Sequence, residues 1–195
     1  MLLLHSWWGL TPFFRRTADR LSDLGYTVLV PDLAEGETFD DPDEARRYLA
    51  EADADRLAGL TLAAVDVARG RAADPDRPIS VIGCSMGASL ALWASVRRPR
   101  DIAAVVAFYG VQSIDFDGAA ARYQVHLASD DELVADDDAA FMEATIGLAG
   151  RPIEVFRYPA TEHFFFERDR KPYDAEAAAL AWDRTVAFLA GPSGE

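Results

Sequence analysis

Residues 79–92 read Ile-Ser-Val-Ile-Gly-Cys-Ser-Met-Gly-Ala-Ser-Leu-Ala-Leu, and this stretch decides the fold. Its β-branched start predicts a buried strand, and its Ala- and Leu-rich end predicts a helix. Between them lies Gly83-Cys84-Ser85-Met86-Gly87, a G-x-S-x-G motif. In a strand-turn-helix context this motif forms a nucleophile elbow, whose glycines keep side chains away from the adjoining strand and helix. We therefore predict Ser85 as a nucleophile and the Met86 amide as an oxyanion donor; the alternative is an ordinary tight turn.

Strand-like and helix-like patterns alternate on both sides of this stretch. Strands are expected at residues 1–5, 26–31, 79–84, 102–108, 123–128 and 153–158. Helices are expected at residues 12–24, 42–72, 86–98, 135–148 and 173–189, with Gly59 or Gly70 interrupting or ending the second. The alternation predicts an α/β protein with a mostly parallel sheet covered by helices on both faces. No repeat or linker divides the chain, so we expect residues 1–195 to form a single domain.

Composition narrows the function. The 195 residues are 50% hydrophobic and 27% charged, with a formal net charge of −14. No basic stripe could neutralise phosphates and no apolar run has the length of a membrane span, so we expect neither nucleic acid nor membrane as a partner. The single cysteine excludes an internal disulfide and fits a cytoplasmic location. No Cys/His cluster has metal spacing, and Asp136-Asp137-Asp138 is interpreted as a solvated helix start, so no metal is expected.

A serine nucleophile needs a base, and the sequence has three histidines. In folds with this elbow the acid and the base follow the serine, each on a loop after a later strand. His163 comes directly after the last predicted strand and is the expected base. His126 falls inside a strand and is interpreted as structural. His5 precedes the elbow, where it could support the oxyanion loop.

The acid is expected in Ser129-Asp130-Asp131-Glu132, after the strand before the last one. Asp130 and Asp131 lie closest to the strand end, and the residue pattern leaves both open. Asp115 and Asp117 follow an earlier strand and are weaker candidates. The structural alternative for the acidic run is a solvated turn that caps the next helix.

The loop after the first strand, Ser6-Trp7-Trp8-Gly9, should supply the second oxyanion donor, and the Trp7 amide is our choice. Two adjacent loop tryptophans also suggest an aromatic pocket wall, for which Trp8 and Phe164 are the candidates. Cys84 is excluded as nucleophile because only Ser85 is in register with the two glycines. We expect Cys84 to be a small buried residue beneath the elbow.

In these segments the chain resembles the dienelactone hydrolase family of α/β-hydrolases. The residues that carry the resemblance are the opening His5–Leu10 loop, "GYTVLVPDL" at 25–33, the elbow, "HLASDD" at 126–131 and "YPATEHF" at 158–164. The resemblance selects Asp131 as the acid and supports His163 as the base. It also implies a shortened α/β-hydrolase sheet of about six strands, without the antiparallel strands that usually precede the first parallel one.

Three positions depart from the family pattern. Ser85 stands where the archetype has a cysteine, Ser6 where it has a glutamate, and Glu167 where it has an arginine, with Arg168 adjacent. The expected activity is cleavage of a small-molecule carboxylic ester or lactone by Ser85, His163 and Asp131, without any cofactor. Alternatives are a thioesterase or peptidase with the same triad, or a non-catalytic binding protein on this scaffold. A homodimer is compatible with this reading.

Overall fold

A single parallel sheet organises the chain in the computed structural model, which describes residues 1–191. Its five strands are β1 (Leu2–Leu4), β2 (Ile79–Cys84), β3 (Ile102–Phe108), β4 (Arg122–Ala128) and β5 (Ile153–Tyr158). They lie side by side in sequence order, and every neighbouring pair is parallel. All carboxyl ends therefore meet at one edge of the sheet, where sites gather in folds of this kind.

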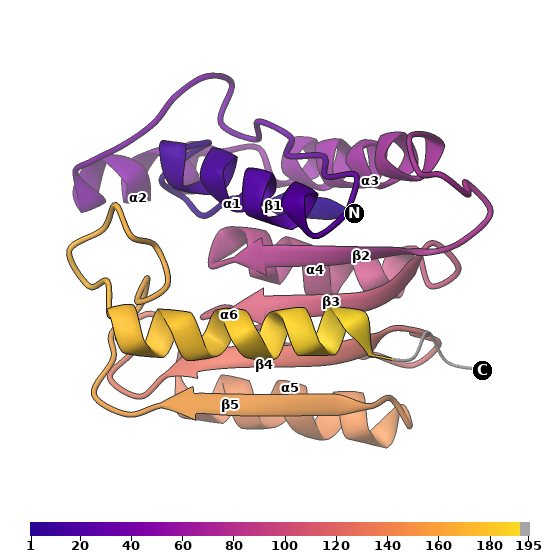
Figure 1. Cartoon of the computed structure of the whole chain (residues 1–195). Helices are drawn as coiled ribbons and strands as arrows, with labels where there is room; N and C mark the ends of the chain where they lie inside the picture. Colours follow the sequence, from indigo (N-terminus) through magenta and orange to yellow (C-terminus); the bar gives the residue numbers. More distant parts are fainter. Residues whose placement is uncertain (192–195) are drawn as a thin grey trace.

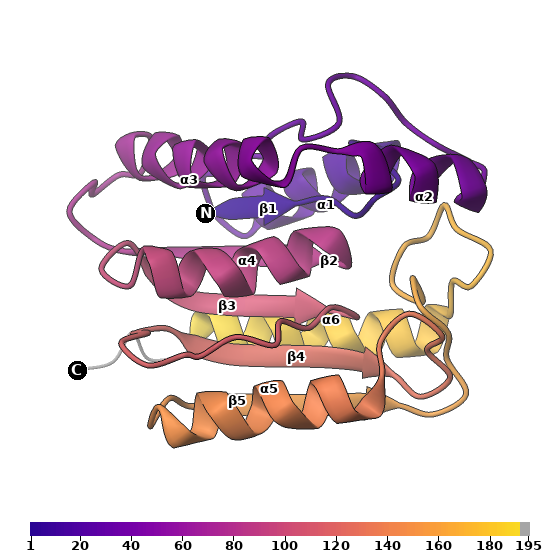
Figure 2. The ribbon, with the colours of Figure 1, turned by 180° about the vertical axis from the view of Figure 1, so that it is seen from behind.

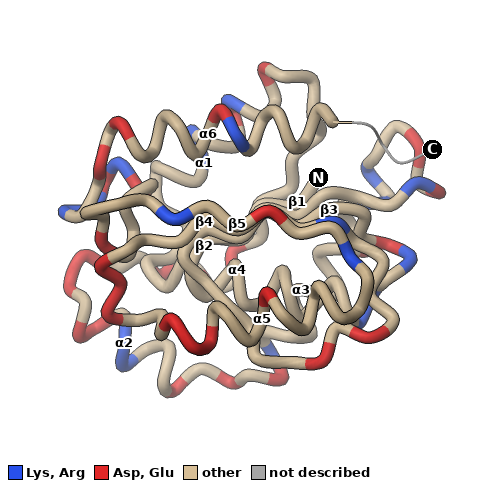
Figure 3. The backbone as a smooth tube through the Cα atoms, turned by 90° about the horizontal axis from the view of Figure 1, so that it is seen from below, with Lys and Arg blue, Asp and Glu red and all other residues tan. Residues whose placement is uncertain are grey.

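Helices cover both faces of the sheet, giving three layers (Figures 1 and 2). The helices are α1 (Pro12–Asp23), α2 (Pro42–Glu51), α3 (Ala54–Gly70), α4 (Met86–Arg97), α5 (Asp136–Leu148) and α6 (Ala175–Ala190). The view along the layers in Figure 3 shows α1 and α6 on one side of the sheet and the other four helices on the opposite side. No helix among residues 1–191 is long and apolar enough to cross a membrane.

Alternating side chains of the strands build a core on each face. Val81, Val105 and Val125 belong to the cluster that packs against α3, α4 and α5. Ile82 and Val106 belong to the second cluster, which packs against α1 and α6. Burial on both faces explains why these strands are continuous apolar runs rather than alternating ones.

The predicted strand at residues 26–31 is wrong, so the sheet has five strands rather than about six. This segment makes only one parallel bridge, between Leu2 and Leu29, with N–O distances of 2.9 and 3.0 Å. Its partner β1 has only three residues, and Pro31 has no N–H with which to continue the ladder.

The single long helix predicted over residues 42–72 is two helices. Gly59 does not interrupt it, whereas Gly70 is the last residue of α3. The break falls after Ala52, whose backbone is extended, and Asp53 starts the next helix by accepting from the amides of Asp55 and Arg56. The N-cap residue Asp53 therefore sets the boundary between the two helices, because its side chain accepts from amides that a new helix leaves without a partner.

Candidate active site

The turn between β2 and α4 holds Ser85 in a strained conformation, with φ 52° and ψ −116°. A Cβ on Gly83 would lie 2.2 Å from the Gly87 carbonyl oxygen, and a Cβ on Gly87 would lie 2.5 Å from the Leu4 carbonyl oxygen. Both positions therefore require glycine. The Ser85 amide is fixed by a 2.9 Å hydrogen bond to the Phe108 carbonyl at the end of β3. These contacts give the Ser85 side chain a defined direction at the carboxyl edge of the sheet.

A continuous hydrogen-bond chain joins three of the predicted residues. The Ser85 hydroxyl lies 2.8 Å from His163 Nε2, and His163 Nδ1 lies 2.8 Å from both carboxylate oxygens of Asp131. One Asp131 oxygen also accepts from the amides of Leu133 and Val134, at 2.9 and 3.1 Å. With Nδ1–H donating to Asp131, Nε2 is left as an acceptor for the serine proton.

Asp130 and His126 do not join this hydrogen-bond chain. Asp130 is exposed and accepts from the Ser129 hydroxyl, so the geometry distinguishes it from its neighbour Asp131. His126 is fully buried between the Tyr158 hydroxyl and the Gln124 side chain, and burial lowers its pKa to about 3. It is a neutral structural side chain of β4.

His5 fixes the loop that follows β1. Its Nδ1 donates to the Ser6 carbonyl at 2.6 Å, and its Nε2 accepts from the Leu33 amide at 2.9 Å. Burial lowers its pKa, which keeps the ring in this neutral tautomer. The loop turns at Gly9, whose φ is 84° and where a Cβ would lie 2.2 Å from the Glu37 carbonyl oxygen.

The two backbone amides predicted as oxyanion donors have no protein acceptor among residues 1–191. They are the Trp7 amide, on the loop held by His5, and the Met86 amide, at the N-terminus of α4. Polar groups of this kind are normally paired when buried. Without a protein acceptor, both amides are free to donate to a ligand oxygen.

A cavity of about 720 Å³ reaches the hydrogen-bond chain at His163. Trp7, Trp8 and Phe164 all line it, and the Trp8 and Phe164 rings meet at a 5.3 Å centroid distance. Its charged lining comprises five acidic and three basic side chains: Asp40, Asp130, Glu132, Glu162, Asp169, Arg46, Arg170 and Lys171. The cavity therefore combines aromatic walls with an excess of negative charge.

The two cavity arginines already have partners. Arg170 stacks over the Trp8 ring at 4.5 Å and donates to the Phe39 carbonyl at 3.0 Å and to Asp40 at 3.2 Å. Arg46 pairs with Asp43. Arg170 is therefore fixed by protein partners, whereas the Arg46 pair is an exposed surface contact.

Glu167, noted in the sequence only as a departure from the family pattern, is a buried carboxyl group next to this site. It accepts from the Ser6 hydroxyl at 3.0 Å and from the Tyr109 hydroxyl at 2.9 Å. Burial raises its pKa to about 8. The Tyr109 ring packs on His163 at 4.9 Å, so this carboxyl group connects the Trp7 loop with the histidine loop.

Cys84 lies in the same region and is 1% exposed, as expected for a residue beneath the elbow. Burial raises the pKa of its thiol well above the usual value, which keeps it protonated and unreactive. A sequence signal for the buried Glu167 does exist: it follows Phe164-Phe165-Phe166, a run too apolar to be an exposed loop. The adjacent charged residues concealed that signal.

Comparisons with known proteins identify relatives over most of the chain. Residues 1–192 match the model for the dienelactone hydrolase family. "Protein usf" of Aquifex pyrophilus is 28% identical over 97% of this chain and 86% of its own length. The carboxymethylenebutenolidase of Pseudomonas putida is 29% identical over 93% of this chain and 81% of its own length.

Solved structures share the fold. A dienelactone hydrolase-like promiscuous phosphotriesterase from metagenomic libraries matches with a TM-score of 0.82 at 21% identity, over 96% of this chain and 84% of that one. Esterase 2 of Thermogutta terrifontis, phosphorylated by paraoxon, matches with a TM-score of 0.72 at 15% identity, over 100% of this chain and 84% of that one. The three-layered architecture is thus that of the α/β-hydrolases.

Proposed function

Since the chain belongs to the dienelactone hydrolase family and is therefore an ester-bond hydrolase, we propose that it works through a Ser85-His163-Asp131 triad. The observation that carries the proposal is the unbroken hydrogen-bond chain from the Ser85 hydroxyl through His163 to Asp131. Its substrate is a small-molecule carboxylic ester or lactone.

Acylation begins when Ser85 Oγ attacks the substrate carbonyl carbon and its proton passes to His163 Nε2. Asp131 keeps the proton on Nδ1 and stabilises the imidazolium that forms. The carbonyl π electrons move to oxygen, and this oxyanion is held by the amides of Trp7 and Met86. The amides are suited to this role because they have no competing acceptor among residues 1–191.

Collapse of the tetrahedral intermediate expels the alcohol, which takes the proton from His163 and leaves an acyl-Ser85. A water molecule then attacks the acyl carbon while His163 accepts its proton. The second intermediate collapses with release of the carboxylic acid, and Ser85 recovers its proton from His163. For a lactone the alcohol and the acid are two ends of one product.

The cavity beside His163 favours a neutral ester. Its charged lining has five acidic and three basic side chains, and the basic Arg170 is already engaged by Phe39 and Asp40. Trp8 and Phe164 offer flat apolar walls to the acyl or alcohol group. A substrate that carries its own carboxylate would meet net repulsion there.

Labelling with a fluorophosphonate probe tests the triad. The wild-type protein should label once, and Ser85→Ala should not label. The control is Ser89→Ala, which alters a serine one turn further along α4 and should label like the wild type. Absence of wild-type labelling, or equal labelling of Ser85→Ala, would show the assignment to be wrong.

Competition between matched substrates tests which bond is cleaved and whether a neutral substrate is preferred over an anionic one. Phenyl propionate should have a kcat/KM about tenfold above that of monophenyl succinate, which adds a carboxylate. Glu132→Gln combined with Glu162→Gln should narrow this ratio. Faster turnover of a matched thioester or amide than of the ester would instead indicate a thioesterase or a peptidase.

A further inference from the structure

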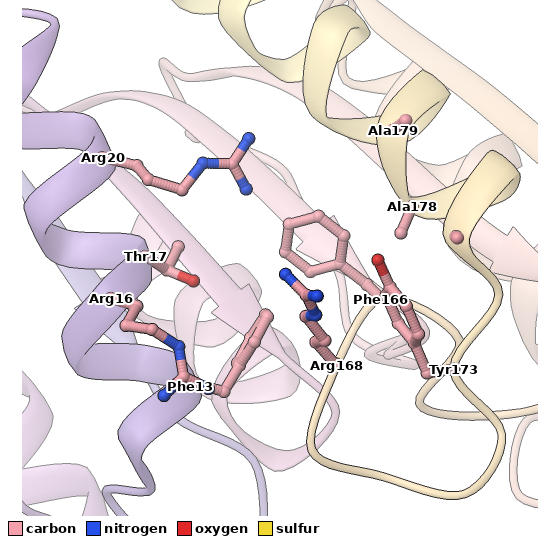
Figure 4. A pocket seen from close by; sticks show the side chains of 10 residues that line it. Phe13, Arg16, Thr17, Arg20, Phe166, Arg168, Tyr173, Ala178 and Ala179 are labelled. Carbon is pink, nitrogen blue, oxygen red and sulfur yellow. The ribbon is translucent and has the colours of Figure 1, made fainter.

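A second hollow, of about 230 Å³, lies between α1 and α6, on the face of the sheet opposite α3, α4 and α5. It shares no lining residue with the cavity beside His163. Figure 4 shows it from close by. Its lining consists of Phe13, Arg16, Thr17, Arg20, Phe166, Arg168, Tyr173, Ala175, Ala178 and Ala179.

The charged side chains of this lining are all arginines. Arg20 and Arg168 extend into the space between the two helices, whereas Arg16 lies along α1 beside Phe13 (Figure 4). Within residues 1–191, none of the three makes a salt bridge or donates a hydrogen bond to a protein acceptor. In a chain of net charge −14, three guanidinium groups at one hollow without a carboxylate in its lining form a local positive site.

Packing restricts the positions of Arg20 and Arg168. The Arg20 guanidinium lies 3.7 Å from the centre of the Trp182 ring on α6, which restricts its side chain. Burial lowers the Arg20 pKa, and the nearby Tyr173 and Asp183 act in the opposite direction. Arg168 projects from the segment just after Glu167, whose side chain is fixed on the other side.

The other walls are apolar or hydroxylated. Phe166 packs edge-on against Phe13 at 5.4 Å, and α6 contributes only small alanine side chains. The Tyr173 ring and its hydroxyl face the hollow, and the Thr17 side chain lies on the α1 side (Figure 4). Aromatic and methyl surfaces beside guanidinium groups suit a ligand with one anionic end and one flat apolar end.

We propose that this hollow binds a small organic anion, with its carboxylate or phosphate group held by Arg20 and Arg168 and its compact apolar body packed against Phe166 and Tyr173. Guanidinium groups bind both head groups through paired, charge-assisted hydrogen bonds. The volume limits the ligand to about the size of a substituted benzene ring. This binding site is separate from the proposed triad, and its test needs no turnover.

Isothermal titration calorimetry with benzoate, phenyl phosphate, inorganic phosphate and neutral benzyl alcohol tests the proposal. An organic anion should bind the wild type at a one-to-one ratio, and benzyl alcohol should bind at least about tenfold more weakly. Comparing benzoate with phenyl phosphate identifies the preferred head group. Tighter binding of phenyl phosphate than of inorganic phosphate shows the contribution of the apolar wall.

Matched variants locate the bound anion. Arg20→Gln and Arg168→Gln should each weaken binding about tenfold, and Arg20→Lys should weaken it less because it keeps the charge. Arg15→Gln removes the same charge from an exposed position of α1 outside the hollow and should leave Kd unchanged. The proposal would be overturned if Arg15→Gln weakened anion binding as much as the two variants of the hollow. It would also be overturned if only Arg46→Gln, in the other cavity, weakened binding, or if neither organic anion bound.

Discussion

Asp131 and Glu167 are both buried carboxylates beside the histidine loop, yet their surroundings differ. The Asp131 side chain is 5% exposed and accepts from two backbone amides and from His163. Glu167 is completely buried and accepts only from two hydroxyl groups. The two groups therefore differ in their hydrogen-bond donors. Backbone amides and an imidazole that can become charged surround Asp131, whereas neutral hydroxyls surround Glu167.

These surroundings suit Asp131 and Glu167 to different roles. A carboxylate that must stabilise an imidazolium needs donors that favour its charged form. Burial is the larger effect at Glu167: it outweighs the hydrogen bonds from Tyr109 and Ser6, which lower the pKa, and raises the pKa to about 8. Burial alone therefore does not identify the proposed catalytic acid; direct contact with His163 does.

The largest expected effect comes from Asp131→Asn. The amide cannot stabilise the imidazolium and favours the wrong histidine tautomer, so kcat should fall by about a thousandfold or more with little change in KM. Steady-state kinetics on a neutral ester measure this. The matched control is Asp130→Asn, one residue away and exposed, which should stay within about twofold of the wild type. Equal losses in both variants would contradict the distinction between the two aspartates.

Glu167→Gln should change stability rather than chemistry. The folded chain binds the Glu167 proton more tightly than the unfolded chain, because the folded pKa is about 8 against an ordinary 4.5. Wild-type stability should therefore be favoured at low pH and fall as pH rises from about 4.5 to about 8, by up to ~5 kcal/mol. Glu167→Gln should lose this dependence.

Urea unfolding at several pH values between about 5 and 9 measures this pH dependence of stability. The control is Glu162→Gln, an exposed position on the same loop, which should keep the wild-type slope. Parallel pH curves for the wild type and Glu167→Gln would contradict the assignment of a near-neutral buried carboxyl group.

Tyr109→Phe sharpens the comparison by removing one of the two hydroxyl donors of Glu167. The Tyr109 hydrogen bond lowers the Glu167 pKa against the effect of burial. Its loss should raise that pKa further, moving the upper end of the stability transition to higher pH. The expected displacement is on the order of one pH unit. A displacement to lower pH would contradict the assigned direction of the hydrogen bond.

Much of this arrangement was predictable because local patterns carry it. The alternation of apolar strands and helices predicts the parallel sheet, and the carboxyl ends of parallel strands necessarily share an edge. The elbow between β2 and α4 therefore brings Ser85 to the edge that also receives the loops after β4 and β5. That residues 26–31 make only an isolated bridge was not predictable in the same way, because their pairing depended on the length of β1.

The sequence by itself determined the fold class, the elbow register that selects Ser85 over Cys84, and the position of His163 after the last strand. These depend on spacing and residue type, which are local properties. The residue pattern left Asp130 and Asp131 open and only the family resemblance favoured Asp131. The tertiary structure shows that Asp131 reaches His163, that Glu167 turns inward, and that Arg168 faces α1 and α6 instead of the cavity beside His163. In a run of adjacent polar residues, the side-chain direction is set by partners distant in sequence, and no local pattern records them.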